Sequence, residues 1–332
     1  MSALFPNFGG VWTPVAFGAH LRKDEARRVV VAGTELVLFR DESGTARALL
    51  DRCPHRGVAL SLGTVRDGRI ECPFHGWTFD GQGRACHVPW NPDAKRDRLG
   101  ARSVPTRELA GHVFVHTAPE DPGVDPFVPD VLVKPGVRVS GFEVVWNVHW
   151  TRAMENMLDS PHLPFVHRAT IGRRMRSRVQ GRMDIDHEET PWGAIQHIRI
   201  DGEPQPGRLD FVFPNRMVLH IPVPGRVFVM MVTCVPESGT RTRMVLTTAR
   251  DFLTWPVLDF VFHRTNARIA REDKAILESC PGEVPPAGEE KSVRTDAPTL
   301  HFRKRYFAEL RTDPPDGSPL GPRARLPVVH AA

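Results

Sequence analysis

Two cysteine and histidine pairs early in the chain give the strongest chemical signal in the sequence. Cys53 and His55 have one residue between them, and Cys72 and His75 have two. Two thiolates and two imidazoles suit a [2Fe-2S] cluster in which the sulfurs hold one iron and the ring nitrogens hold the other. A glycine close behind each histidine lets the backbone turn tightly around the cluster.

Two other interpretations of these four residues stay open at this point. A Cys2His2 zinc site also takes two sulfur and two nitrogen ligands, although zinc sites usually pair like residues across a knuckle. The same residues could also be buried without any metal. The remaining cysteines, Cys86, Cys234 and Cys280, have no partner pattern and are expected to be small buried residues. Five widely spaced cysteines argue against a disulfide framework.

A second pair of candidate metal ligands, His162 and His167, lies far downstream. Pro161 and Pro164 predict an interrupted helix here, which could turn both imidazoles toward one metal. One added carboxylate would complete a facial triad of two histidines and one carboxylate, which leaves coordination positions open for O2 and substrate. Two histidines in such a stretch are also common as ordinary polar residues.

The segments C-P-H-R-G and C-P-F-H-G-W resemble the Rieske motif of oxygenases and ferredoxins. Respiratory-type Rieske proteins have an additional cysteine in each segment, and this chain does not. Asp159, His162 and His167 form D-x-x-H-x-x-x-x-H, which resembles the motif of Rieske non-haem iron oxygenase α-subunits. The resemblance covers about residues 8 to 310 and is strongest to the single-subunit monooxygenase and demethylase branch, of the vanillate demethylase and dicamba monooxygenase type.

This resemblance implies a mononuclear Fe(II) whose third ligand is a carboxylate on a long C-terminal helix. The segment R-E-D-K-A-I-L-E matches the family pattern and makes Asp273 the expected ligand, beside His162 and His167. Glu272 is the competitor and Glu278 a weaker one. All three could instead belong to a solvated helix face.

The resemblance also implies catalytic roles for Asp159 and Asn156. In the family the aspartate connects a histidine of the mononuclear iron to a cluster ligand of the neighbouring subunit, here expected to be His75. Such a connection requires an oligomer, and the family commonly forms head-to-tail homotrimers. Asn156 could equally be a simple surface residue.

The implied reaction is O2-dependent hydroxylation or oxidative demethylation of a small to medium-sized, cyclic or aromatic substrate. Electrons would come from NAD(P)H through a separate flavin reductase or ferredoxin. Three alternatives remain: an electron-transfer Rieske protein with an appended binding domain, a ring-cis-dihydroxylating dioxygenase, and a zinc-binding structural protein.

The elements that must position these residues indicate an α+β fold. Residues 8–118 are expected to form an all-β Rieske domain, because short β-type runs alternate with glycine-containing turns. Residues 119–312 are expected to form the catalytic domain, with an antiparallel sheet and long helices, and by resemblance a helix-grip-like architecture. Residues 313–332 form a tail rich in proline and arginine. The expected elements of the catalytic domain are strands at 141–150, 194–200, 209–213, 216–221, 227–236 and 243–250 and helices at 152–159 and 258–280.

The composition is typical of a globular protein with a packed core. Of its 332 residues, 41% are hydrophobic and 25% are charged, and the net charge is +5. Basic residues form only short clusters, without the aromatic-interleaved stripe of a nucleic-acid surface, so no nucleic-acid partner is expected. We found neither a membrane-length apolar run nor a signal-peptide pattern, so a cytoplasmic location without membrane association is expected.

Overall fold

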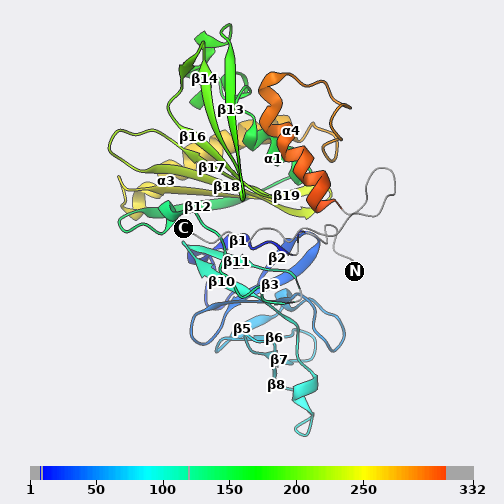
Figure 1. Cartoon of the computed structure of the whole chain (residues 1–332). Helices are drawn as coiled ribbons and strands as arrows, with labels where there is room; N and C mark the ends of the chain where they lie inside the picture. Colours follow the sequence, from blue (N-terminus) through cyan, green and yellow to red (C-terminus); the bar gives the residue numbers. More distant parts are fainter. Residues whose placement is uncertain (1–7, 9, 119, 312–332) are drawn as a thin grey trace. The chain divides into compact units, whose positions relative to one another are not determined.

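The computed structural model describes residues 8, 10–118 and 120–311 and divides the chain into two compact units (Figure 1). The first unit extends to Phe127 and the second begins at Val128. The first unit continues past the predicted boundary at residue 118 because residues 120–127 are hydrogen-bonded to it. Trp12 Nε1 donates a hydrogen bond of 2.8 Å to the carbonyl of Val124. The predicted tail at 313–332 lies outside the described residues.

The first unit contains three antiparallel sheets, with strand orders β1-β11-β10, β2-β3-β4-β9 and β5-β6-β7-β8. Its buried core combines apolar side chains such as Phe39, Leu60 and Phe79 with the two cysteines Cys53 and Cys72. The candidate cluster ligands are therefore part of the core. The strand bounds are Thr13–Phe17 (β1), Arg27–Val31 (β2), Thr34–Arg40 (β3), Ala46–Leu50 (β4), Thr64–Arg66 (β5), Arg69–Glu71 (β6), Thr78–Phe79 (β7), Ala85–His87 (β8), Ser103–Val104 (β9), Thr106–Leu109 (β10) and His112–Val115 (β11).

The second unit is built on a curved antiparallel sheet with the order β12-β19-β18-β17-β16-β14-β13, and β15 pairs with β14. Its strands are Arg138–Trp146 (β12), Met183–Thr190 (β13), Gly193–Ile200 (β14), Glu203–Pro204 (β15), Arg208–Val212 (β16), Arg216–His220 (β17), Phe228–Ser238 (β18) and Arg241–Arg250 (β19). Its helices are Trp150–Leu158 (α1), Leu163–Val166 (α2), Asp259–Leu277 (α3) and Ala297–Arg305 (α4), and a π-helical turn follows at Tyr306–Leu310.

The start of α3 is bonded to two strands of this sheet. Asp259 accepts hydrogen bonds of 3.0 Å from Arg138 Nε of β12 and 2.6 Å from Arg250 Nη2 of β19. Although partial burial opposes it, these two guanidinium groups lower the pKa of the Asp259 carboxyl to about 2. Helix α3 is thus fixed to the sheet at the end opposite the candidate iron ligand Asp273.

The α+β fold class is confirmed, whereas several element bounds differ from those predicted. The strand expected over 141–150 ends at Trp146, and Trp150 instead begins α1, because the side chain of His149 caps this helix. Strand β13 was not predicted, because its D-I-D-H-E-E sequence has few of the apolar residues that mark a half-buried strand. Helix α4 was likewise not predicted as a helix.

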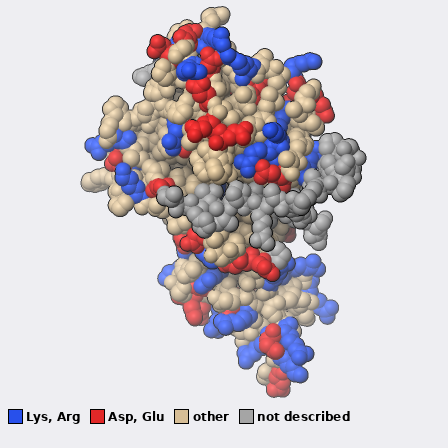
Figure 2. All heavy atoms as spheres, in the orientation of Figure 1, with Lys and Arg blue, Asp and Glu red and all other residues tan. Residues whose placement is uncertain are grey.

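The described helices include none that is both long enough and apolar enough to cross a membrane. On the face drawn in Figure 2, basic and acidic side chains are mixed on each unit. A mixed distribution of this kind does not by itself identify a charged binding surface.

Candidate functional site

The two cysteine and histidine pairs lie in two loops with the same backbone hydrogen bonds. In the loop after β4, the N–H of Cys53 donates to the carbonyl of Val58, and the N–H of Gly57 donates back to Cys53. In the loop after β6, the N–H of Cys72 donates to Trp77, and that of Gly76 donates back to Cys72. The two glycines have φ angles of +76° and +69°, which favour glycine. The sequence therefore forms the same turn twice.

In these loops the cysteine thiols are buried in the core and the histidine imidazoles lie nearer the surface. Cys53 and Cys72 are each 2% exposed, whereas His55 is half-buried and His75 is exposed. The two imidazole rings lie 4.5 Å apart between centroids, and Trp77 stacks on His55 at 4.6 Å. The structure thus brings together all four residues that the sequence analysis proposed as cluster ligands.

The chemistry of these four side chains fits a Rieske cluster. Nδ1 of His55 is buried and has no hydrogen-bond partner among the described residues, so it is free to bind a metal. Burial, together with the adjacent thiol of Cys72, raises the pKa of Cys53 to about 11. A thiol in this setting ionises when a metal replaces its proton. Loss of solvent and the neighbouring His75 lower the pKa of His55, which favours the neutral, ligating form of this ring.

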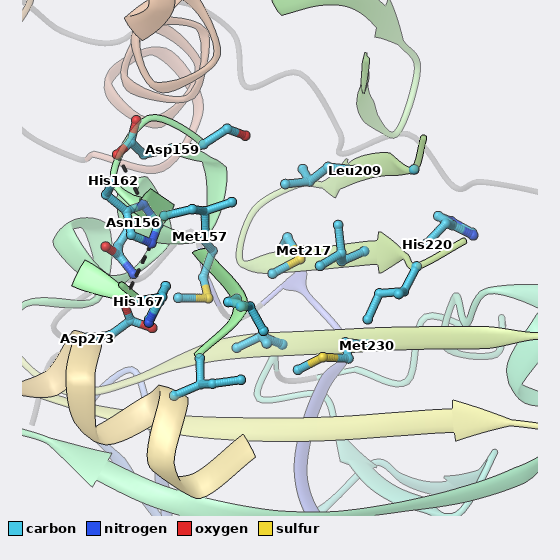
Figure 3. A pocket seen from close by; sticks show the side chains of 18 of the residues that line it. Asn156, Met157, Asp159, His162, His167, Leu209, Met217, His220, Met230 and Asp273 are labelled. Atoms are coloured by element: carbon cyan, nitrogen blue, oxygen red, sulfur yellow. Dashed lines mark hydrogen bonds and ion pairs between the residues drawn. The ribbon is translucent and has the colours of Figure 1, made fainter. Parts of the chain in front are cut away.

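A second group of candidate ligands converges in the second unit (Figure 3). His162 immediately precedes α2, His167 follows it, and Asp273 lies on α3. Oδ1 of Asp273 is 3.6 Å from Nε2 of His162 and 3.0 Å from Nε2 of His167. This buried oxygen makes no hydrogen bond of acceptable geometry to any described residue. Two imidazole nitrogens and one carboxylate oxygen therefore face a common point, as in a facial triad.

The opposite nitrogen of each imidazole is held by a different carboxylate. Nδ1 of His162 donates to Asp159 at 3.2 Å, and Nδ1 of His167 donates to Glu272 at 2.9 Å. Because a carboxylate can only accept, each bond keeps the proton on Nδ1 and leaves Nε2 available as a ligand. Although burial opposes it, the adjacent carboxylates of Asp273 and Glu272 raise the pKa of His167.

The three carboxylates considered in the sequence analysis thus occupy different places. Asp273 faces both Nε2 atoms, and Glu272 lies on the other side of His167, where Thr170 also donates to it at 2.7 Å. Glu278 accepts the backbone N–H of Asn147 and lies apart from the histidines.

An apolar cavity of about 340 Å³ adjoins this group of ligands. Figure 3 shows His162, His167 and Asp273 at one side and Leu209, Met217 and Met230 at the other. Asn156 and Asp159 also line the cavity, so both candidate catalytic residues border it. A cavity with mostly apolar walls and few polar groups is typical of a site for a small organic ligand.

Gln196 is a polar lining residue that the sequence analysis missed. It is 2% exposed, and neither its amide oxygen nor its amide nitrogen has a hydrogen-bond partner among the described residues. It lies on β14 between Ala194 and Ile198, which share its face of the sheet. A lone amide at an inward position of a predicted strand was the available signal.

Comparisons with known proteins identify both regions. Residues 11–105 match the Rieske [2Fe-2S] domain, and residues 208–311 match the Vanillate O-demethylase oxygenase C-terminal domain. With these two domains in this order, the chain is similar to Rieske non-haem iron oxygenases. The family prediction is therefore confirmed. So is the cofactor prediction at family level, since such proteins use a Rieske cluster, a mononuclear iron and O2.

Individual relatives of the chain include enzymes with different substrates. Chlorophyllide a oxygenase of Chlamydomonas reinhardtii is 29% identical over 80% of this chain and 42% of its own length. The oxygenase component of dicamba O-demethylase from Stenotrophomonas maltophilia is 34% identical over 48% of this chain and 47% of its own. The chain spans about half the length of the curated relatives it matches.

The structure of NdmA from Pseudomonas putida CBB5 has a similar fold. It superimposes with a TM-score of 0.75 at 22% identity, covering 90% of this chain and 89% of its own. At this level of identity the likeness shows the fold alone.

Proposed function

We propose that the chain is the oxygenase component of a Rieske-type monooxygenase that hydroxylates or oxidatively demethylates a small to medium-sized cyclic or aromatic molecule. The observation that carries this proposal is the convergence of His162, His167 and Asp273 at the wall of an apolar cavity. A protein that only carried electrons would need neither an open ligand set nor a cavity beside it. The cavity volume suits a molecule of the size of a substituted aromatic ring.

In this proposal Cys53, His55, Cys72 and His75 hold the [2Fe-2S] cluster, and His162, His167 and Asp273 hold the mononuclear iron. When bound, the cluster supplies single electrons and the iron supplies the activation of O2. Asp159 and Glu272 fix the proton of each histidine on Nδ1 and hold both rings in their orientation. Asp273 brings a negative charge that offsets part of the charge of a divalent metal ion.

The cavity walls would bind the substrate and exclude water. Apolar side chains from four strands, including Leu209, Leu219, Met230 and Leu246, favour an apolar ring. The amides of Gln196 and Asn156 are among the polar groups placed to orient it. Orientation matters because the position of the substrate carbon determines which bond is oxidised.

The activity also requires partners that the chain itself does not supply. We propose a flavin reductase or ferredoxin as the electron donor, and a head-to-tail homotrimer in which Asp159 approaches His75 of the neighbouring subunit. Sedimentation of the native protein tests the trimer, and the variant Asp159→Asn tests the connection. A cytoplasmic location stays a prediction, since the chlorophyllide a oxygenase relatives are chloroplastic.

The variant His162→Ala tests the proposed function directly. The holoprotein is purified with its cluster, supplied with a surrogate reductase and NADH, and screened against aromatic methyl ethers and acids for product. We expect the variant to keep its cluster absorbance and lose both the chelatable iron and product formation. Incorporation of one atom from ¹⁸O2, rather than two, would separate monooxygenation from ring dihydroxylation.

A matched control is available on the same sheet. His197 is exposed on β14, and we expect His197→Ala to retain iron and turnover. If the unmodified protein, with its cluster intact, bound no chelatable iron and formed no product, the electron-transfer alternative would replace the oxygenase proposal. Turnover by His162→Ala equal to that of the His197→Ala control would instead contradict the assignment of His162 as an iron ligand.

A further inference from the structure

A second group of potential metal ligands lies outside the cavity, where α4 packs against the edge strand β13 (Figure 1). It consists of His187 and Glu189 on β13 and His301 on α4, and one ligand atom from each lies within 4.8 Å of the others. The imidazole centroids of His187 and His301 are 4.6 Å apart. The proposed oxygenase chemistry uses none of these residues.

The histidines have nitrogen atoms that the surrounding protein leaves unbonded. Both ring nitrogens of His187 and Nε2 of His301 are buried without a hydrogen-bond partner among the described residues. Nδ1 of His301 lies 3.1 Å from a carboxylate oxygen of Glu189, so only that nitrogen has a polar neighbour at ion-pair distance. A buried polar group without a partner is costly, so three such atoms in one cluster indicate a missing ligand.

The chemistry of the group selects a cation. Neither ring nitrogen of His187 has a hydrogen-bond partner among the described residues, so this ring can offer a lone pair to a ligand. Two neutral imidazoles offer two nitrogen lone pairs, and Glu189 adds a negative charge. The Glu189 carboxylate would repel an anion, and an apolar ligand would leave the nitrogens unsatisfied. A divalent transition metal ion satisfies all three residues at once.

We propose that His187, Glu189 and His301 form a second metal site, distinct from the iron site, that takes Zn²⁺ and fastens α4 to the edge of the sheet. Two imidazoles, one carboxylate and a water molecule make a common tetrahedral zinc environment. The side chain of Glu189 is 70% exposed, so it can swing to complete the ligand set and the site stays open to solvent.

The position of the site explains why such a fastening would matter. β13 is the last strand of the sheet and pairs on one side only, with β14. Helix α4 itself is held to α1, because Arg303 of α4 forms an ion pair with Glu155 of α1. The metal would therefore connect the edge strand β13 to helix α4.

Metal analysis of the holoprotein tests this site independently of turnover. The purified protein is dialysed against a slight excess of Zn²⁺ and then against buffer, and zinc and iron are both counted per chain. We expect about one zinc per chain in the unmodified protein, with unchanged iron. Added Zn²⁺ at about a hundredfold excess over Kd should raise the melting temperature by about 5 °C.

Three variants locate the zinc. His187→Ala and His301→Ala should lose both the bound zinc and the rise in melting temperature, and His197→Ala should keep both. Glu189→Gln is exposed enough to fold in any case, and it should weaken zinc binding by about tenfold or more. If the unmodified protein bound no more zinc than His187→Ala, the site would be disproved. If the histidine variants did not fold, the same comparison with Glu189→Gln would decide. Iron content and turnover, recorded in parallel, report on the proposed function separately.

Discussion

The two candidate metal centres of this chain are built in opposite ways. The four proposed cluster ligands lie between residues 53 and 75, in two loops that repeat one pattern of backbone hydrogen bonds. The proposed iron ligands come from two helical segments far apart in the sequence, and the bond between His167 and Glu272 alone spans 105 residues. The first centre depends mainly on local turns, and the second on the packing of α3 against the sheet.

This difference determines what can damage each centre. The cluster loops form from hydrogen bonds within short segments, and the buried Cys53 and Cys72 anchor both loops in one small core. The iron site exists only while α2 and α3 keep their mutual position. We therefore expect changes at a distance to affect the iron before the cluster, and changes at a ligand to affect its own centre alone.

The largest effect is expected for Cys72→Ser in the local centre. This change removes one of the two thiolates, so the cluster should fail to assemble and turnover should be abolished, while the mononuclear iron is still bound. Visible absorbance and acid-labile sulfide measure the cluster, and chelatable iron measures the other site. Cys86→Ser, in the same unit but outside the loops, should leave both unchanged. A brown, fully active Cys72→Ser protein would contradict the ligand assignment.

A smaller but clear effect is expected for Glu272→Gln in the long-range centre. The amide carries no charge to balance that of His167. It can present either its oxygen or its NH2 group to Nδ1 and so no longer fixes the proton there, and the affinity for iron should fall by about 10 to 100-fold. The cluster should be unaffected. Iron release to a chelator, followed over time, measures this change.

Asp273→Ala provides the comparison for this prediction. It should abolish iron binding outright, because its Oδ1 faces both Nε2 atoms. The reverse ranking of the two variants would make Glu272 the ligand.

Asp259→Asn tests the dependence of the iron site on distant packing. In the folded protein the pKa of Asp259 is about 2, below its ordinary 3.8, so its ion pairs stabilise the fold above about pH 4 and this contribution is lost as the pH falls toward 2. At pH 7 the variant should lose about 2 kcal/mol of unfolding free energy, and its stability should vary less between pH 5 and 2.

The measurement for this variant is urea unfolding at several pH values, with iron release and cluster absorbance recorded together. Iron should be released at a lower urea concentration than in the unmodified protein, with the cluster transition unchanged. Asp186→Asn is the control, because Asp186 pairs with Arg199 at the exposed surface and should change stability by less than about 0.5 kcal/mol. Simultaneous loss of iron and cluster would show that the cluster depends on the packing of α3 as much as the iron site does.

The same contrast explains how much the sequence could predict. The cluster loops were predicted residue by residue because ligand identity, spacing and turn glycines are all local. The choice between Asp273 and Glu272 stayed open, because neighbouring residues on a helix point in different directions and only the packing of α3 decides which one faces the histidines.

What the sequence did not predict depends on contacts between distant elements. β13 has only two apolar residues, Met183 and Ile185, and becomes a strand only because β14 pairs with it. His187 and His301 carry no spacing signal at all, since one lies on a strand and the other on a helix more than a hundred residues later. Gln196 resembles any strand residue until its amide is found unpaired in a buried cavity.

Gln196→Leu gives the smallest expected effect and separates function from stability. Replacing an unpaired buried amide with an apolar side chain of similar size should raise the unfolding free energy by about 1 kcal/mol. If the amide orients the substrate, KM should nevertheless rise about tenfold, equivalent to about 1.4 kcal/mol of lost binding. Ile198→Leu, on the same face of β14, alters the cavity wall without removing a polar atom and should change KM by less than about threefold. A gain in stability with KM unchanged would show that Gln196 only lines the cavity, and orientation of the substrate would then depend on Asn156 and the apolar wall.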